Sequence, residues 1–144
     1  MKLNKPKFWE TKNNFVYFIL YPLSLIFLAF VSIKKKIIKP LKFNIPIICV
    51  GNIYLGGTGK TPVSIFIANE LKTLGKRPVI IRKFYQSHKD EHKLIKANFE
   101  SLILNKIRKF GIYEAEKNNH DVAILDDGFQ DYSIEKNFSI LCFN

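Results

Sequence analysis

Short apolar runs separated by polar segments divide the chain after residue 42. Each run has the length and composition of a buried strand, and the runs lie at 47–50, 78–81, 101–104, 122–125 and 138–143. Between the first two runs, apolar residues recur at helical spacing up to Gly75, a plausible C-terminal stop. This strand–turn–helix–strand order is a βαβ unit, which predicts a parallel sheet with a right-handed crossover.

The remaining segments complete an α/β pattern. The sequence predicts a helix near 105–118, between two of the apolar runs. Residues 82–98 are polar and are expected to form an irregular, mostly solvated loop. Pro40 and Pro46 bracket a short linker into the first strand. We therefore expect one α/β domain over 43–144, in which a mostly parallel sheet is flanked by helices.

An apolar segment of a different kind precedes this domain. The run Phe15–Ser32 is close to the ~20 residues needed to cross a bilayer, and Pro22 inside it is expected to kink or break a helix. Lys34, Lys35 and Lys36 follow directly. The segment is too long for a signal-peptide core and lacks a clear cleavage site. An interfacial helix or hairpin is favoured over a single span or a helix buried on protein.

Charge supports the membrane interpretation of residues 1–42. The chain of 144 residues carries a net charge of +11, and residues 1–42, with nine lysines and one glutamate, contribute +8 of it. Basic charge beside an apolar run favours an anionic membrane surface, and no nucleic-acid-binding module is visible. Apolar residues form 47% of the chain, which excludes compositional disorder. Cys49 and Cys142 fall in predicted strands without metal or disulfide spacing, which weakly favours a reducing, cytoplasmic setting.

The segment from Gly51 to Pro62 carries the clearest candidate chemistry. It places Gly56, Gly57, Thr58 and Gly59 between a strand and a helix, which is the context of a phosphate-binding loop. Lys60 could reach the β- and γ-phosphates of a nucleotide, and the Thr61 hydroxyl could ligate Mg²⁺. Tyr54 stands where the P-loop pattern has its first glycine. The alternative is a glycine-rich turn that caps an ordinary helix.

A second candidate site follows the apolar run at 122–125. Asp126 and Asp127 come at its end, as in a Walker B element. The carboxyl ends of parallel strands meet at one edge of a sheet, so these carboxylates are expected near the glycine loop. Oxygen ligands of this kind suit Mg²⁺. An acidic turn is the alternative, and the upstream Lys60-Thr61 pair favours metal binding.

Together, the two motifs resemble a known family. Gly51-Asn52 before the loop, Gly56–Pro62, and Leu125–Gln130 with the sequence Leu-Asp-Asp-Gly-Phe-Gln are similar to the tetraacyldisaccharide 4′-kinases, the lipid A 4′-kinases. Pro22-Leu23-Ser24 resembles the membrane-associated start of that family. The resemblance implies a P-loop NTPase-like fold and ATP-dependent phosphorylation of the 4′-hydroxyl of a lipid A disaccharide precursor. It also implies a location at the cytoplasmic face of the inner membrane, peripheral or monotopic.

The resemblance also suggests roles for individual residues. The glycine-loop residues with Lys60 and Thr61 would bind ATP and Mg²⁺, with Asp126, Asp127 and Gln130 beside them. Asp90 and Glu91 match the Asp-Glu of a family Asp-Glu-Pro element, whose aspartate assists the acceptor hydroxyl. Two positions and one segment depart from the family pattern: His92 replaces its proline, Asp131 replaces a histidine, and Ile81–Tyr85 replaces Ser-Arg-Gly-Tyr-Gly.

The resemblance covers nearly all of this chain but only about the first half of a family member. Three hypotheses follow. The chain is a lipid kinase in which Lys60 and Asp90 are catalytic. Alternatively, it is a truncated, membrane-attached ATP-binding remnant, or one half of a split kinase that needs a second-lobe polypeptide. A different membrane-linked P-loop ATPase is disfavoured by Asp126–Gln130.

Overall fold

The computed structural model describes residues 15–52, 59–85 and 89–143. By its contacts the chain divides into two compact units, residues 1–39 and 40–144. In the first unit, helix α1 runs over Phe15–Ile37, and from residue 18 onward its large apolar side chains are exposed. By its length and composition alone, α1 could cross a membrane.

Pro22 was expected to kink or break a helix; it lies inside α1 and does not break it, and a kink there stays a prediction. The loss of one backbone donor leaves the hydrogen bonds of the other turns intact, and long apolar helices tolerate such a position. Nearby, the Ser24 hydroxyl donates to the Tyr21 carbonyl at 2.7 Å. Lys34, Lys35 and Lys36 occupy the last turn, where cations interact favourably with the helix dipole.

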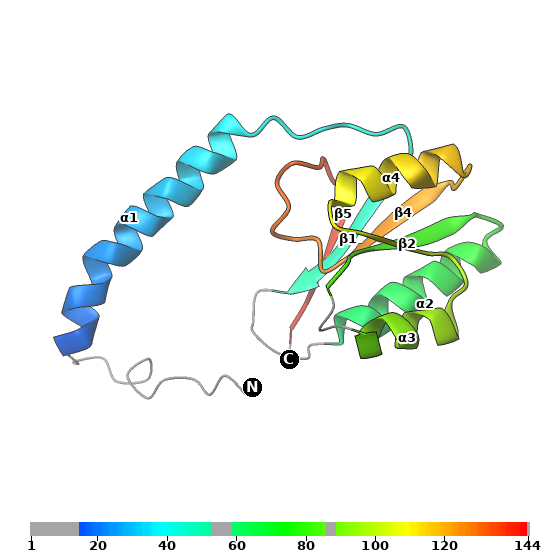
Figure 1. The fold of residues 1–144 in the computed structure, drawn as a ribbon, viewed down its shortest axis with the longest axis horizontal. Helices are drawn as coiled ribbons and strands as arrows, with labels where there is room; N and C mark the ends of the chain where they lie inside the picture. Colours follow the sequence, from blue (N-terminus) through cyan, green and yellow to red (C-terminus); the bar gives the residue numbers. More distant parts are fainter. Residues whose placement is uncertain (1–14, 53–58, 86–88, 144) are drawn as a thin grey trace. The chain divides into compact units, whose positions relative to one another are not determined.

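The second unit is built on one parallel sheet. Its described strands are β1 (Ile47–Asn52), β2 (Pro78–Lys83), β3 (Leu102–Asn105), β4 (Val122–Asp126) and β5 (Phe138–Cys142). They form a five-stranded sheet in the order β3-β2-β4-β1-β5, and all four neighbouring pairs are parallel (Figure 1). The predicted fold class, a P-loop NTPase-like α/β domain preceded by an apolar helix, is confirmed.

Helices cover both faces of the sheet. Helix α4 (Arg108–Lys117) packs on one face, and α2 (Lys60–Thr73) and α3 (Lys89–Asn98) pack on the other (Figure 1). Along β1, Ile47 and Cys49 belong to the core under α4, whereas Val50 belongs to the core under α2 and α3. This alternation follows from the two-residue period of a strand. Parallel strands buried on both faces explain why the sequence shows continuous apolar runs.

Residues 82–98 were expected to be irregular, which was wrong, and mostly solvated, which holds for most of the described residues. Strand β2 continues through Arg82 to Lys83, and α3 begins at Lys89. One face of this short helix is buried, because Ile95 is fully enclosed and His92 is only 6% exposed. The helix was missed because it contains three lysines and few apolar residues, so the sequence shows no apolar run at this place.

Candidate nucleotide-binding site

The described part of the predicted site lies at the carboxyl edge of the sheet. Gly59 has a φ of +74°, a left-handed conformation that suits glycine, and helix α2 begins at the next residue. The Val63 amide donates to the Gly59 carbonyl at 3.1 Å and so closes the first helical turn. Gly56, Gly57 and Thr58 lie outside the described residues, so the loop assigned to them stays a prediction.

Lys60 connects the helix start to two strand ends. Its Nζ lies 2.9 Å from Oδ1 of Asn52, the last residue of β1, and 2.9 Å from Oδ1 of Asp127. The Lys60 side chain is 21% exposed, and that of Asp127 is 47% exposed. The ammonium group is therefore fixed at the sheet edge by two oxygens and still reaches solvent.

The buried face of α2 points a second set of groups at β4. Thr61, Ser64 and Ala68 are its buried residues, at the spacing of one helical face. Thr61 Oγ1 donates to Oδ2 of Asp126 at 3.1 Å, and Ser64 Oγ donates to Oδ1 at 3.1 Å. Asp126 is fully buried, and each of its carboxylate oxygens accepts a hydrogen bond from a protein donor.

Arg82 supplies the positive charge for this buried carboxylate. In the parallel ladder Arg82 lies directly opposite Asp126, so strand register places the two side chains together. Arg82 Nη1 donates to Asp126 Oδ2 and, at 3.0 Å, to Thr61 Oγ1, while Nη2 pairs with Glu91 of α3. Sequence analysis gave Arg82 no role, although a cation after an apolar run could have drawn attention to it.

Asp127 has an unusual backbone conformation that is held from several sides. Its φ is +59°, which aspartate tolerates better than most residues. Its amide donates to the Val50 carbonyl at 2.9 Å, and its carbonyl accepts a hydrogen bond from Arg108. These contacts direct its carboxylate at Lys60, across from the start of α2.

The two motifs also fit together by shape. A Cβ built on Gly51 of β1 would lie 2.2 Å from Cδ2 of Phe129 and 2.9 Å from its Cβ. Only glycine therefore gives the Phe129 ring room against β1. The segment after β4 is held in place beside the strand that leads into the glycine loop.

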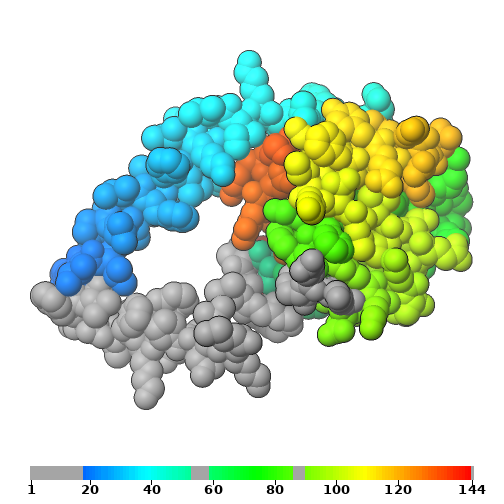
Figure 2. Space-filling model, viewed as in Figure 1, coloured from blue at the N-terminus to red at the C-terminus, as the bar shows by residue number. Residues whose placement is uncertain are grey.

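A cavity of about 330 Å³ adjoins Asp127. It is lined by Lys83, Tyr85, Arg108, Asp127, Gln130 and Asp131. In Figure 2, α4 (yellow) and the segment after β4 (orange) lie side by side on the visible surface of this unit. Gln130, assigned to the active site from sequence, thus shares a cavity with Asp127.

The two acidic residues of α3 differ in their surroundings. Asp90 is exposed in the first turn of the helix, and Glu91 contacts Arg82. Within the described residues, Glu91 is the member of this pair that joins the Asp126 network. The assignment of Asp90 to catalysis stays a prediction.

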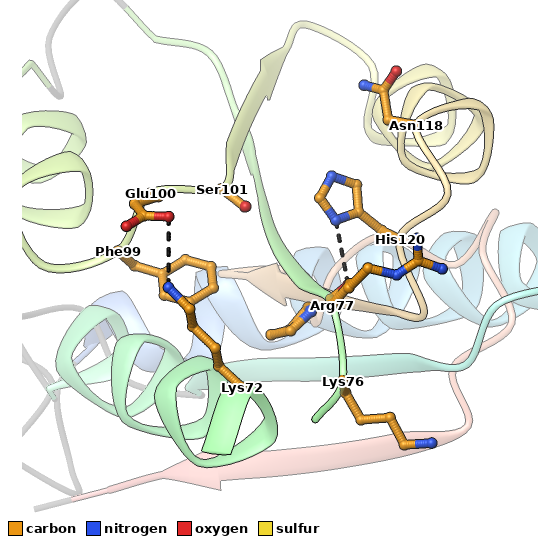
Figure 3. Close-up of a pocket in the computed structure, with 9 residues that line it drawn as sticks. Lys72, Lys76, Arg77, Phe99, Glu100, Ser101, Asn118 and His120 are labelled. Carbon is orange, nitrogen blue, oxygen red and sulfur yellow. Dashed lines mark hydrogen bonds and ion pairs between the residues drawn. The ribbon is translucent and has the colours of Figure 1, made fainter. Parts of the chain in front are cut away.

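Another pocket lies at the opposite edge of the sheet. It has a volume of about 260 Å³, and its lining includes Pro78, the first residue of β2. Ser101, which precedes β3, also lines it (Figure 3). Lys72 pairs with Glu100 there at 3.5 Å, and the His120 ring lies 3.2 Å from the Arg77 carbonyl (Figure 3). Because Lys60 and Asp126 lie at the carboxyl edge, this pocket is separate from the candidate site.

Comparisons with known proteins agree with the motifs. Residues 16–101 match the sequence model of a family described as tetraacyldisaccharide-1-P 4′-kinase. A tetraacyldisaccharide 4′-kinase from Pelagibacter ubique is 43% identical over the whole chain and 46% of the relative. One from Rickettsia bellii is 33% identical over 98% of the chain and 48% of the relative.

A solved structure shows the same fold. The crystal structure of an "apo" form of LpxK from Aquifex aeolicus in complex with ATP superposes with a TM-score of 0.70 at 27% identity. The match covers 88% of this chain and 48% of that one. The chain therefore spans about half the length of the curated relatives it matches.

Proposed function

The chain belongs to the tetraacyldisaccharide 4′-kinase family, and we propose that it carries the ATP-binding part of a lipid kinase. The reaction would transfer the γ-phosphoryl group of ATP to the 4′-hydroxyl of a tetraacyldisaccharide 1-phosphate, a lipid A precursor. The single observation that carries this proposal is the position of Lys60. Its ammonium lies at the start of α2, 2.9 Å from Asp127, at the carboxyl edge of the sheet.

Lys60 and the start of α2 would bind the phosphates. A helix N-terminus and a lysine together favour an anion, and the Lys60 ammonium would offset charge on the transferred group. Asp127 and Asn52 keep this ammonium at the sheet edge. In this proposal, the phosphates would also accept hydrogen bonds from the backbone amides of Gly56, Gly57, Thr58 and Gly59.

The oxygens of Thr61, Asp126 and Asp127 suit Mg²⁺. Mg²⁺ is commonly held by one or two carboxylates together with substrate phosphates, and Thr61 Oγ1 lies 3.1 Å from Asp126 Oδ2. Among the described residues, no cluster of three His, Cys, Asp or Glu side chains occurs. When bound, Mg²⁺ would neutralise charge on the β- and γ-phosphates.

Asp90 on α3 is the proposed partner of the acceptor hydroxyl. Asp90 would accept the proton of the 4′-hydroxyl or orient that hydroxyl, with Glu91 and Gln130 nearby in the proposed site. In-line positioning of the acceptor contributes much of the catalysis in phosphoryl transfer. A second-lobe polypeptide is a proposed partner that would help to enclose the acceptor.

Binding of ATP is the direct test of this function. The Lys60→Ala variant of the detergent-solubilised chain should lose Mg·ATP binding in isothermal titration calorimetry, because the phosphates lose their positive partner. Lys76→Ala, which removes an exposed lysine at the opposite edge of the sheet, is the matched control and should bind like the unmodified chain. Equal affinity of the Lys60→Ala variant would remove the phosphate-loop assignment.

A catalytically weak ATP-binding protein is the second candidate. It is favoured by the position of Asp90, the proposed acceptor group, which is exposed on α3. Both candidates require ATP binding through Lys60, and they differ in phosphoryl transfer to the lipid.

A further inference from the structure

Arg82 joins three elements at the proposed metal site. Its side chain is 6% exposed, and it comes from β2. The guanidinium contacts Asp126 at the end of β4, Thr61 in the first turn of α2 and Glu91 in the first turn of α3. A buried arginine with such partners is expensive to desolvate, so its contacts are expected to serve more than packing.

The contacts of Arg82 coincide with the proposed metal ligands. Asp126 Oδ2 accepts hydrogen bonds from both Arg82 and Thr61, and Thr61 Oγ1 accepts one from Arg82. Oδ1 of Asp126 accepts from Ser64. A divalent metal drawn to these oxygens would meet a guanidinium on the same lone pairs, and two cations at such short range repel each other.

Glu91 offers the guanidinium a second anion. Its carboxylate is 48% exposed, in contrast to the fully buried carboxylate of Asp126. Glu91 therefore shares the positive charge of Arg82 with Asp126. Arg82 contacts Asp126 through Nη1 and Glu91 through Nη2, so both contacts exist together, and the charge of Glu91 offsets part of the positive charge that a metal at Asp126 would meet.

We propose that Arg82 is a positioning residue that sets the affinity of the Asp126–Thr61 pair for a divalent metal, and that Glu91 tunes this affinity by neutralising part of the charge of the guanidinium. The inference rests on the metal site of the proposed function. In this arrangement, metal binding is coupled to α3, the helix that also carries Asp90.

Metal affinity can be measured without nucleotide. Mn²⁺ alone is titrated into the full, detergent-solubilised chain, and free Mn²⁺ is followed by electron paramagnetic resonance. The variants are Arg82→Gln, Glu91→Gln and the double variant. Arg77→Gln and Glu100→Gln are matched controls, because they remove the same charges from ion pairs at the opposite edge of the sheet.

Opposite effects are expected from the two single variants. Arg82→Gln removes the competing cation and should tighten Mn²⁺ binding by about tenfold or more. Glu91→Gln should weaken it by about threefold, since the guanidinium then loses the negative charge of Glu91 beside it. In the double variant, the effect of Glu91→Gln should vanish, because Glu91 acts through Arg82. The controls should match the unmodified chain.

Several results would overturn the inference. One is that a folded Arg82→Gln variant binds Mn²⁺ as tightly as the unmodified chain or more weakly. Another is that Glu91→Gln still changes the Mn²⁺ affinity when Arg82 is replaced by glutamine. A purely structural role for Arg82 would weaken binding in both single variants. Mn²⁺ binding that none of the variants changes, or that is undetectable in all of them, also contradicts it. Circular dichroism establishes that each variant is folded.

A second substitution keeps the test decisive if Arg82→Gln fails to fold. Arg82→Lys retains the charge but lacks separate nitrogens for two carboxylates, so the effect of Glu91→Gln should shrink in that background. An undiminished effect would reject the proposal. Because ATP binding is measured separately by calorimetry, loss of the proposed ATP function would leave the Mn²⁺ result interpretable.

Discussion

At the scale of single residues, burial separates two thiols that look alike in sequence. Cys49 is fully buried in β1, and burial raises the pKa of its thiol above the ordinary value, although Lys136 and Arg108 oppose the shift. Cys142 in the edge strand β5 is only partly buried. Both thiols are free.

We therefore predict that iodoacetamide modifies Cys142 well before Cys49 at about pH 8, because the thiolate is the nucleophile and Cys49 is both protonated and enclosed. Peptide mass spectrometry of timed samples measures the two rates. In guanidinium chloride the rates should converge, which is the control. Equal rates in the native protein would mean that β1 is not buried as described.

Several residues of the candidate site could be predicted from sequence, and others could not. Lys60, Thr61, Asp126 and Asp127 belong to local patterns of a strand followed by a turn, and parallel strands bring such ends together. The structure does bring these four side chains to one edge. The role of Arg82 depends on which strands are neighbours and in what register, and neither can be read from one segment.

At the scale of elements, the close approach of β1 and the segment after β4 should be sensitive to one methyl group. Gly51→Ala would place its Cβ 2.2 Å from Phe129 Cδ2, so the ring must move. We expect a loss of about 1–3 kcal/mol in the free energy of unfolding, measured by urea denaturation. Phe129→Leu in the same chain should recover part of that loss. Strictly additive losses in the double variant would contradict this contact.

The strands themselves were the most predictable elements. Each is a short apolar run bounded by polar or turn residues, and in the central strands β1, β2 and β4 burial on both faces makes the run continuous. Helix α3 was not predicted, because its buried side chains are spaced among lysines. The order of the strands was also beyond the sequence pattern, since β4 inserts between β1 and β2, whose βαβ unit precedes it in the chain.

Helix α1 should bind membranes through two separable contributions. Its exposed apolar side chains would enter the bilayer interface, and Lys34, Lys35 and Lys36 would attract anionic headgroups. We predict that replacing all three lysines by glutamine weakens flotation with anionic vesicles but leaves flotation with neutral vesicles unchanged. Residues 40–144 alone should float with neither. Flotation of 40–144 as efficient as that of the full chain would reject this role for α1.

At the scale of the whole molecule, nucleotide binding and turnover make different demands. The described edge of the sheet groups Lys60, Thr61 and Asp126, the residues proposed to bind the nucleotide and its metal. Transfer also requires the acceptor hydroxyl in line with the γ-phosphate and shielded from water. Such orientation is worth about 7–11 kcal/mol of barrier. Asp90, the proposed group nearest the acceptor, is exposed to solvent on α3.

We predict that the 144-residue chain alone binds ATP but phosphorylates tetraacyldisaccharide 1-phosphate very slowly or not at all. The assay follows labelled γ-phosphate from ATP into the lipid, with Lys60→Ala as the background control. A polypeptide that supplies the second lobe of the family should raise the rate by enclosing the acceptor, while leaving ATP affinity nearly unchanged. Robust transfer by the chain alone that disappears in Asp90→Ala would instead establish that one lobe is a complete kinase, with Asp90 positioned by contacts that form only when substrate is bound.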